Sequence, residues 1–249
     1  MDTELRAFWQ RFFEFNWKFG VFLIILICVP RFLLVLEANA TGNYGYIGII
    51  MLVSAMAPFL FLTQSGRRDI GIVSSGNYGW LLTAFVCGLL ISLLLYVAGK
   101  ICYGNSYENW YIYIGKSYRI PDHIDEKTKS ILFTVMAVTG MTFSPVGEEL
   151  FFRGIVHSSF AKSIGNTNAS LVDSTAFALT HISHFGLIFL DGQWTLLPLP
   201  TIIWIISMFF VSILFSLFKK YSGSILGSII CHSAFNLGMI YAIFYLLKN

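Results

Sequence analysis

The chain has 249 residues, of which 56% are apolar and only 12% are charged, and its mean hydropathy is +0.72. A soluble domain is about a quarter charged, so this composition excludes an ordinary soluble globule, a disordered chain and a nucleic-acid-binding protein. The net charge of +3 is too small to indicate an anionic partner, and we expect one transmembrane domain over residues 1–249.

Hydrophobic runs long enough to cross a bilayer recur along the chain. A spanning helix needs about 20 mostly apolar residues, and the fourth run is expected to continue out of the membrane over residues 151–163. Because the runs are continuous rather than alternating, we expect an all-α polytopic transmembrane helical bundle of about seven to eight spans. The predicted spans are 18–36, 44–63, 78–98, 131–150, 169–190, 198–217 and 224–246.

The first apolar run ends at Ala38-Asn39-Ala40, which is similar to a signal-peptidase site. Acidic residues before the run argue against a leader peptide, so we interpret the run as a retained span. Residues 1–130 are expected to hold the N-terminal spans and an aromatic loop, and residues 131–246 the catalytic core. The aromatic segment 99–130 is typical of an interfacial belt, and a substrate lid is the alternative.

Basic loops predict that the N-terminus of this multi-pass cell-membrane protein is cytoplasmic, because Lys and Arg accumulate on that side. The residues placed on that side are Arg6, Arg11, Lys18, Arg67, Arg68, Lys162, Lys219 and Lys220. The segment 99–130 is an exception, since its five basic residues are predicted on the opposite side. The four cysteines are far apart and form no CxxC pair, which supports neither a zinc knuckle nor a disulfide framework.

Three of the predicted spans contain polar or ionisable residues that would lie inside the bilayer. An ionisable residue inside a bilayer costs about 2.5–3.5 kcal/mol on insertion scales, so each is a candidate for function. At a rise of about 1.5 Å per residue, the three spans could bring their polar groups to similar depths of about 12–21 Å. The candidates are Glu148, Glu149 and Arg153 on the fourth span, Asp173, His181 and His184 on the fifth, and His232 and Asn236 on the seventh. Asp173 is expected to be wetted near the surface.

Spacing within each helix suggests a division of roles. Glu149 and Arg153 are four residues apart, so they can pair on one face, whereas Glu148 points about 100° away and would stay free for chemistry. Phe177 can wall one side of the His181 ring by the same spacing. His232 and Asn236 also share a face, as two donors to one oxyanion would require.

These residue types are suited to two chemistries. Glu148 could act as a base with His181 as its partner, while His232 and Asn236 stabilise a tetrahedral oxyanion. Alternatively, Glu148, His181 and His232 could bind zinc. The sequence lacks HExxH and GxSxG motifs, which excludes the usual zinc-peptidase helix and nucleophile elbow. Both chemistries stay open at this point.

Three short motifs occur in order on separate apolar segments. Residues 148–153 match EExxxR, residues 177–181 match FxxxH, and residues 232–236 match HxxxN. Over about residues 130–246 the chain resembles the CPBP family, which contains CAAX prenyl proteases of the Ras-converting type and bacteriocin-processing and self-immunity proteins. The resemblance implies an intramembrane endopeptidase in which Glu148 and His181 act on the catalytic water and His232 and Asn236 form the oxyanion hole.

We expect a glutamate-type intramembrane protease without a cofactor, with zinc as the unfavoured alternative. Its partners would be the lipid bilayer and a membrane-bound peptide or protein, either a prenylated CAAX-type tail or a leader peptide, and no nucleic acid. The supporting residues would be Glu149, Arg153, Phe177 and His184. The rival hypotheses are a non-catalytic scaffold or bacteriocin self-immunity protein, and a proton-coupled or metal transporter.

Overall fold

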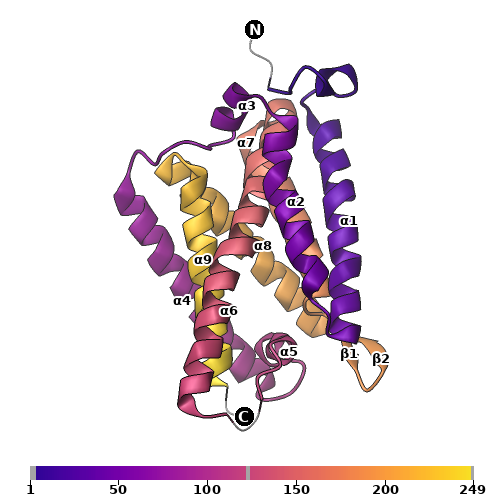
Figure 1. The fold of residues 1–249 in the computed structure, drawn as a ribbon, viewed down its shortest axis with the longest axis vertical. Coiled ribbons are helices and arrows are strands. Elements are labelled where there is room, and N and C mark those ends of the chain that lie inside the picture. The colour runs from indigo at the N-terminus through magenta and orange to yellow at the C-terminus, as the bar shows by residue number, and fades with distance from the viewer. Residues whose placement is uncertain (1–3, 122–123, 248–249) are drawn as a thin grey trace.

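The computed structural model describes residues 4–121 and 124–247 and consists almost wholly of helices. Figure 1 shows them as a tall bundle in which most long helices run roughly from top to bottom. The main helices are α1 (Trp17–Thr41), α2 (Gly45–Phe61), α3 (Gln64–Asp69), α4 (Tyr78–Tyr103), α5 (Trp110–Ser117), α6 (Glu126–Glu149), α7 (His157–Thr180), α8 (Pro198–Ser222) and α9 (Ile225–Tyr241). The short elements are η1 (Trp9–Arg11), η2 (Leu150–Val156), η3 (His181–Ser183) and η4 (Ala242–Leu246).

Five helical segments in the described residues are long and apolar enough to cross a membrane, and α2 is a shorter apolar helix. One of the five runs over Glu126–Ser183, a length of 58 residues. A straight helix of that length would measure about 87 Å, far more than the roughly 30 Å of a bilayer core. This segment must therefore turn, and the structure shows where. The predicted polytopic helical bundle is confirmed.

The turn lies at Gly165, whose φ of 79° and ψ of 162° interrupt α7. At one end of α1, the backbone N–H of Trp17 donates to Ser163 Oγ over 3.2 Å. At the other end, Asn39 Nδ2 donates to the Ser183 carbonyl over 2.7 Å. The part of α7 after Gly165 therefore runs alongside α1, back toward the face from which α6 came.

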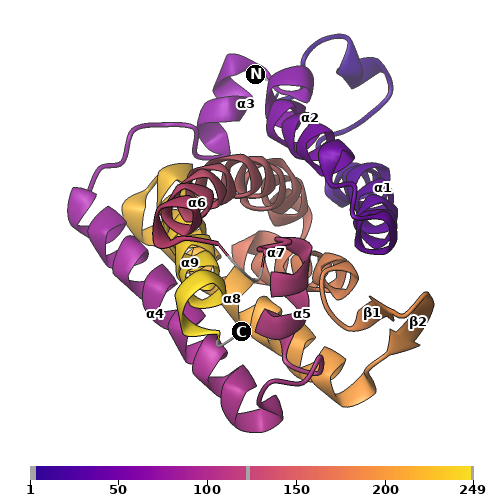
Figure 2. The ribbon, with the colours of Figure 1, turned by 60° about the horizontal axis from the view of Figure 1, so that its bottom comes forward.

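Close helix crossings fix α9 inside the bundle. A Cβ added to Gly88 of α4 would lie 2.1 Å from the Cys231 carbonyl oxygen, and one added to Gly238 of α9 would lie 2.9 Å from Ser92 Cβ. Small residues let helix backbones approach in this way inside membranes. Figure 2 shows α9 enclosed by α4, α6 and α8. The segment that contains His232 is thereby held in place from several sides.

The predicted span over residues 169–190 is wrong in its last part. α7 ends at Thr180, and β1 (Leu187–Leu190) pairs antiparallel with β2 (Gln193–Leu196). The two turn residues, Asp191 and Gly192, have φ values of 49° and 77°. Two positive φ angles in a two-residue loop are typical of the type I′ hairpin that Asp-Gly favours. The bundle is all-α apart from this hairpin.

The aromatic side chains of α5 are buried in the bundle and not exposed to a membrane interface. Trp110 and Tyr111 of α5 are 1% and 0% exposed. Trp110 stacks on Trp204 of α8 with ring centroids 6.0 Å apart, and the Tyr113 hydroxyl accepts a hydrogen bond from the Phe189 N–H over 2.8 Å. The short helix α5 therefore packs its aromatic side chains into the interior of the bundle, against α8.

Candidate active site

The structure brings the four residues with expected catalytic roles to the wall of one cavity of about 530 Å³. Glu148 lies at the end of α6, His181 directly after α7, and both His232 and Asn236 on α9. Phe177 also lines this cavity, as does His184. Glu149 and Arg153 are wholly buried at 0% exposure, behind the wall. Helices far apart in sequence thus meet at one site.

Glu148 is not free, contrary to the expectation from its helical position. Its Oε1 accepts a hydrogen bond from Arg31 Nη2 over 2.9 Å and another from Ser144 Oγ. Arg31 is 4% exposed and Glu148 is 2% exposed, so this is an ion pair in the interior. Spacing on α6 could not reveal it, because Arg31 belongs to α1. An arginine inside an apolar span was itself the signal, since such a charge needs a partner.

The second oxygen of Glu148 faces His181. Glu148 Oε2 has no hydrogen-bond partner within the described part of the chain, and it lies 4.0 Å from His181 Nε2. That distance is too long for a direct hydrogen bond. His181 Nδ1 lies 2.7 Å from the Phe177 carbonyl oxygen. A carbonyl can only accept, so Nδ1 carries the proton, and Nε2 of the neutral ring is an acceptor.

Glu149 links Arg153 to His232. Its Oε1 accepts from Arg153 Nη1 over 3.2 Å and from His232 Nδ1 over 2.7 Å. The predicted Glu149–Arg153 pair is therefore confirmed, and it includes a third member. The His232 ring also stacks on Phe215 at a centroid distance of 4.6 Å. Two contacts fix the orientation of this imidazole, and Nδ1 points to Glu149.

Arg153 is enclosed on all sides by polar and aromatic partners. It donates to the Ser212 carbonyl oxygen over 3.2 Å and to Ser212 Oγ. Its guanidinium lies 4.4 Å from the centre of the Phe177 ring, a distance typical of a cation–π contact. The Phe177 ring also contacts the His181 ring, with the two ring centroids 4.2 Å apart. Phe177 therefore packs against both the buried cation and the His181 imidazole.

Asn236 lies at the cavity but is turned toward α6. Its Nδ2 donates to the Gly140 carbonyl oxygen over 2.9 Å. An amide nitrogen carries two hydrogens, so one remains for another acceptor. Within the described residues no hydrogen bond joins Asn236 to His232, although both line the same cavity.

A π-helical stretch follows the two glutamates. Residues Leu150–Val156 form η2, and all seven are buried. Such stretches are rare and are frequent at functional sites. Lys219 Nζ from α8 donates to the Arg153 carbonyl oxygen over 2.5 Å, which satisfies a backbone group inside the irregular turn. No sequence pattern indicates a role for this lysine beyond its place in a basic loop.

A second buried pair lies on α7. His157 Nδ1 lies 2.7 Å from Asp173 Oδ2, and Asp173 is 0% exposed. The expectation that Asp173 is wetted near the membrane surface is therefore wrong. The turn at Gly165 folds the two halves of α7 together, so that His157 reaches Asp173.

The arrangement does not fit the zinc site that Glu148, His181 and His232 could form. Across residues 4–121 and 124–247, no three His, Cys, Asp or Glu side chains converge as metal ligands. A catalytic zinc site needs three protein ligands around one point. The Arg31 guanidinium also lies against Glu148, and its positive charge would oppose a cation bound to that carboxylate.

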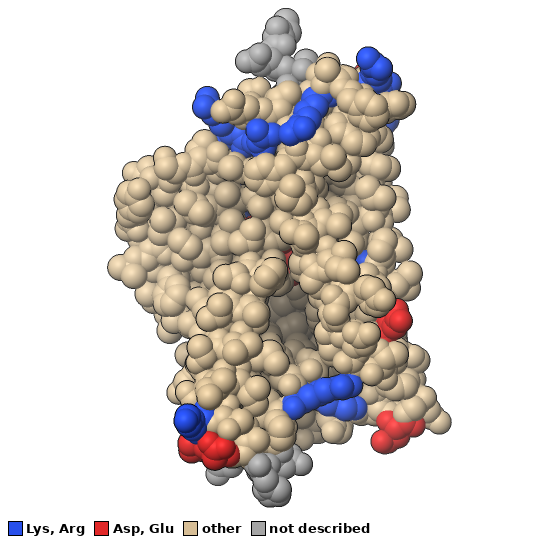
Figure 3. Space-filling view, in the orientation of Figure 1, with Lys and Arg blue, Asp and Glu red and all other residues tan. Residues whose placement is uncertain are grey.

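The cavity is bounded by α2 on one side and α6 on the other. The two helices cross where a Cβ on Gly147 would lie 2.6 Å from the Met51 carbonyl oxygen. Away from this crossing, Gly48 of α2 and Phe143 of α6 both line the cavity. Figure 3 shows a hollow in the lower half of this face, among uncharged side chains and above a basic strip. An opening on an apolar flank is accessible from the bilayer.

One comparison with known proteins identifies the core. The family model for "Type II CAAX prenyl endopeptidase Rce1-like" matches residues 130–238. Residues 130–238 are therefore similar to the Rce1-like family. This segment contains all four cavity residues with expected catalytic roles. No curated protein and no solved structure matches the chain. The similarity to a family of prenyl endopeptidases, together with several apolar helices, indicates a multi-pass membrane protein with a protease-like core.

Proposed function

We propose that this Rce1-like protein is an intramembrane endopeptidase of the glutamate type, which hydrolyses a peptide bond in a membrane-associated peptide. The observation that carries the proposal is the pair of acceptors at the cavity wall. Glu148 Oε2 is unpartnered among the described residues and lies 4.0 Å from His181 Nε2. A water molecule that contacts both would donate both of its hydrogens to them.

Such a water is poised for attack. With both hydrogens bound to Glu148 and His181, an oxygen lone pair points away from them into the cavity. As the water oxygen forms a bond to the scissile carbonyl carbon, Glu148 accepts one of its protons. That proton then passes to the leaving nitrogen as the carbon–nitrogen bond breaks. Arg31 keeps Glu148 charged before attack, because an adjacent guanidinium favours the carboxylate form.

The developing oxyanion would be stabilised from α9. Because His232 Nδ1 is directed at Glu149 over 2.7 Å, Nε2 can donate only when the ring is an imidazolium. Asn236 Nδ2 has a second hydrogen beyond the one bound by Gly140. Together these two donors supply the electrostatic stabilisation that acyl transfer needs.

The substrate would enter from the bilayer between α2 and α6. The opening on this apolar flank suits a lipid-anchored peptide, and the family description points to a prenylated CAAX-type tail. A leader peptide is the other candidate substrate. No cofactor takes part in this scheme, and the lipid bilayer is the remaining partner. We place the protein in the cell membrane with a cytoplasmic N-terminus.

Mass spectrometry of peptide products tests the proposal. Purified wild-type protein and Glu148→Gln would each be incubated with a farnesylated CAAX peptide, the same peptide without the lipid, and unlipidated leader peptides. The proposal predicts fragments with wild type only, and a requirement for the farnesyl group would identify the prenylated substrate class. Fragments that form equally with Glu148→Gln would contradict the assigned mechanism. Intact peptides in every sample, with a cellular effect that survives Glu148→Gln, would favour the scaffold instead.

A further inference from the structure

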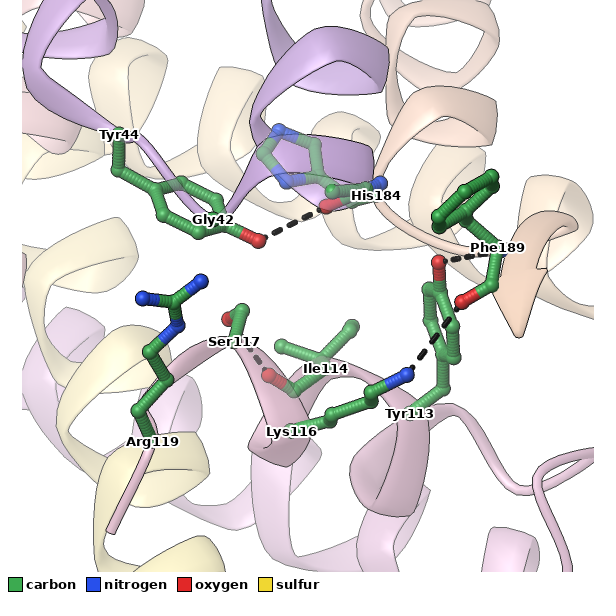
Figure 4. A pocket seen from close by; sticks show the side chains of 10 residues that line it. Gly42, Tyr44, Tyr113, Ile114, Lys116, Ser117, Arg119, His184 and Phe189 are labelled. Carbon is green, nitrogen blue, oxygen red and sulfur yellow. Dashed lines mark hydrogen bonds between the residues drawn. The ribbon is translucent and has the colours of Figure 1, made fainter. Parts of the chain in front are cut away.

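A second pocket adjoins the catalytic cavity at the end of the bundle formed by α5 (Figure 4). Its volume is about 80 Å³, which is room for a small polar group and a few waters. Four residues line both the pocket and the cavity, namely Tyr44, Ile114, Ser117 and His184. The two spaces therefore adjoin and share part of their walls.

Two cations line this pocket without acidic partners. Lys116 and Arg119 form no ion pair with any residue in the described ranges, and no acidic residue lines the pocket. Each makes one long contact with a backbone carbonyl oxygen. Lys116 Nζ lies 3.4 Å from Phe189 O, and Arg119 Nη2 lies 3.4 Å from Thr41 O. Their charges are available to an anion.

The guanidinium of Arg119 is held at the pocket by the chain opposite. A Cβ added to Gly42, which has a φ of 74°, would lie 1.2 Å from Arg119 Nη2. Only glycine leaves space for the guanidinium here. Two hydroxyl groups of the wall already have partners, because the Tyr44 hydroxyl donates to Asn39 Oδ1 over 2.9 Å and the Tyr113 hydroxyl accepts from the Phe189 N–H over 2.8 Å. The unsatisfied charge in the wall is therefore positive.

We propose that this pocket binds the C-terminal carboxylate of the peptide that is cut in the adjoining cavity. This inference rests on the proposed function. An extended residue spans about 3.3–3.6 Å, so a tail of two to four residues would reach about 7–14 Å beyond the cut. Such a tail can pass from the cavity into the pocket along their shared wall. Arg119 offers a planar fork of donors to a carboxylate, and Lys116 adds a point charge.

A lipid headgroup phosphate is the other anion available in a membrane. Continuity with the catalytic cavity favours the peptide carboxylate, since the shared wall leads to the reacting groups and a headgroup has no need of that path. Different changes remove the negative charge of each ligand. Amidation of the peptide end abolishes the carboxylate charge, whereas a change of bilayer composition alters only the headgroups.

A binding experiment with matched peptides tests the inference. A fluorescent substrate peptide with a free carboxylate and its C-terminal amide would be titrated into the Glu148→Gln protein in nanodiscs of neutral lipid. We expect the carboxylate form to bind about five- to tenfold more tightly, as a charge-assisted contact at an accessible site would give. Adding Lys116→Gln and Arg119→Gln together should bring this ratio close to one. Lys127→Gln removes an exposed charge outside the pocket and should leave the ratio unchanged.

The same peptides in a cleavage assay separate this inference from the proposed function. If wild type cleaves both peptides with equal kcat/KM, the carboxylate site is wrong and the protease stands. If nothing is cleaved but binding discrimination disappears with Lys116→Gln and Arg119→Gln, the pocket stands and the protease does not. Equal binding of acid and amide, or a response to anionic lipid alone, would overturn the inference.

Discussion

The two neighbouring glutamates have different partners, and this difference sets their roles. Glu148 pairs with Arg31 at the cavity wall, whereas Glu149 pairs with Arg153, which is 0% exposed. A charge at a wet cavity can be solvated when its partner is removed, but a fully enclosed charge cannot. Breaking an enclosed pair costs about 3–5 kcal/mol. Loss of the Glu149 charge should therefore destabilise the fold more than loss of the Glu148 charge.

We expect Glu149→Gln to lower the melting temperature in detergent far more than Glu148→Gln does. The first change leaves the Arg153 charge enclosed without a counter-ion, at a cost of about 3–5 kcal/mol. The second leaves Arg31 beside a cavity and an amide oxygen that still accepts. Differential scanning fluorimetry of both variants measures this. Equal losses of melting temperature would show that Glu148 is as much a structural residue as Glu149.

Arg31 should be coupled to Glu148. Arg31→Met alone leaves the Glu148 carboxylate at the cavity wall without its cation, and is expected to destabilise the protein by less than the roughly 3–5 kcal/mol of an enclosed pair. In the Arg31→Met/Glu148→Gln double variant no charge is stranded, so most of the stability should return. Denaturation of the wild type, both single variants and the double variant completes the cycle. Additive losses would show that the ion pair contributes nothing.

At residue scale, motif spacing predicted which side chains meet but not what they bind. The Glu149–Arg153 pair follows from helical geometry alone. The pairing of Arg31 with Glu148 spans 117 positions, and no local pattern reports it. The turn of Asn236 toward Gly140 is equally invisible, because it depends on how closely α9 approaches α6.

At the scale of elements, the π-helical segment η2 connects the glutamates to the rest of α7. The Arg153 carbonyl oxygen within this segment accepts a hydrogen bond from Lys219 of α8. We regard Lys219 as a positioning residue. It acts on Glu148 and Glu149 only through the backbone that carries them.

We expect Lys219→Met to lower kcat by about tenfold to a hundredfold, since an unsatisfied buried carbonyl costs about 1–3 kcal/mol. KM should change little, because the lysine does not line the cavity. Lys220→Met, at the exposed neighbouring position, is the matched control, and Lys219→Arg should recover part of the rate. Steady-state kinetics in micelles distinguish these outcomes. A change confined to KM would place Lys219 in substrate binding instead.

The opening between α2 and α6 makes a second element-scale prediction. Gly48 lines the cavity, and a Cβ there would meet no atom within 4 Å. Gly48→Ala should therefore be tolerated, with a gain of about 0.5–1 kcal/mol in helix propensity. Gly48→Trp would fill the opening and should lower kcat/KM at least tenfold while the fold persists. Unchanged kcat/KM in Gly48→Trp would show that substrate enters elsewhere.

The elements themselves were predictable where hydrophobicity alone decides them. Each predicted span contains a helix, because a bilayer demands long apolar runs. The one error is the last part of the span 169–190, which forms a hairpin. Asp191-Gly192 between apolar residues is a recognised signal for that hairpin. η2 and the aromatic packing of α5 depend on neighbours from distant segments, so no local pattern marks them.

For the whole molecule, the basic residues predict orientation, and one cysteine can report it. Cys102 is exposed at the end of α4, whereas Cys28 and Cys231 are buried and Cys87 is partly buried. With a cytoplasmic N-terminus, Cys102 would lie on the outer side. A membrane-impermeant maleimide should then label intact cells through Cys102, and Cys102→Ser should abolish the signal. Labelling only after lysis would reverse the orientation.

Single-turnover kinetics measure directly whether Glu148 activates water for peptide hydrolysis. Excess wild-type or Glu148→Gln protein would be mixed with a labelled substrate peptide, after binding of the uncleaved peptide and melting temperature have been measured for both. The account predicts comparable binding and folding, with a cleavage rate lowered at least a thousandfold in Glu148→Gln, of the order expected when a general base is removed. A rate within tenfold of wild type would contradict it.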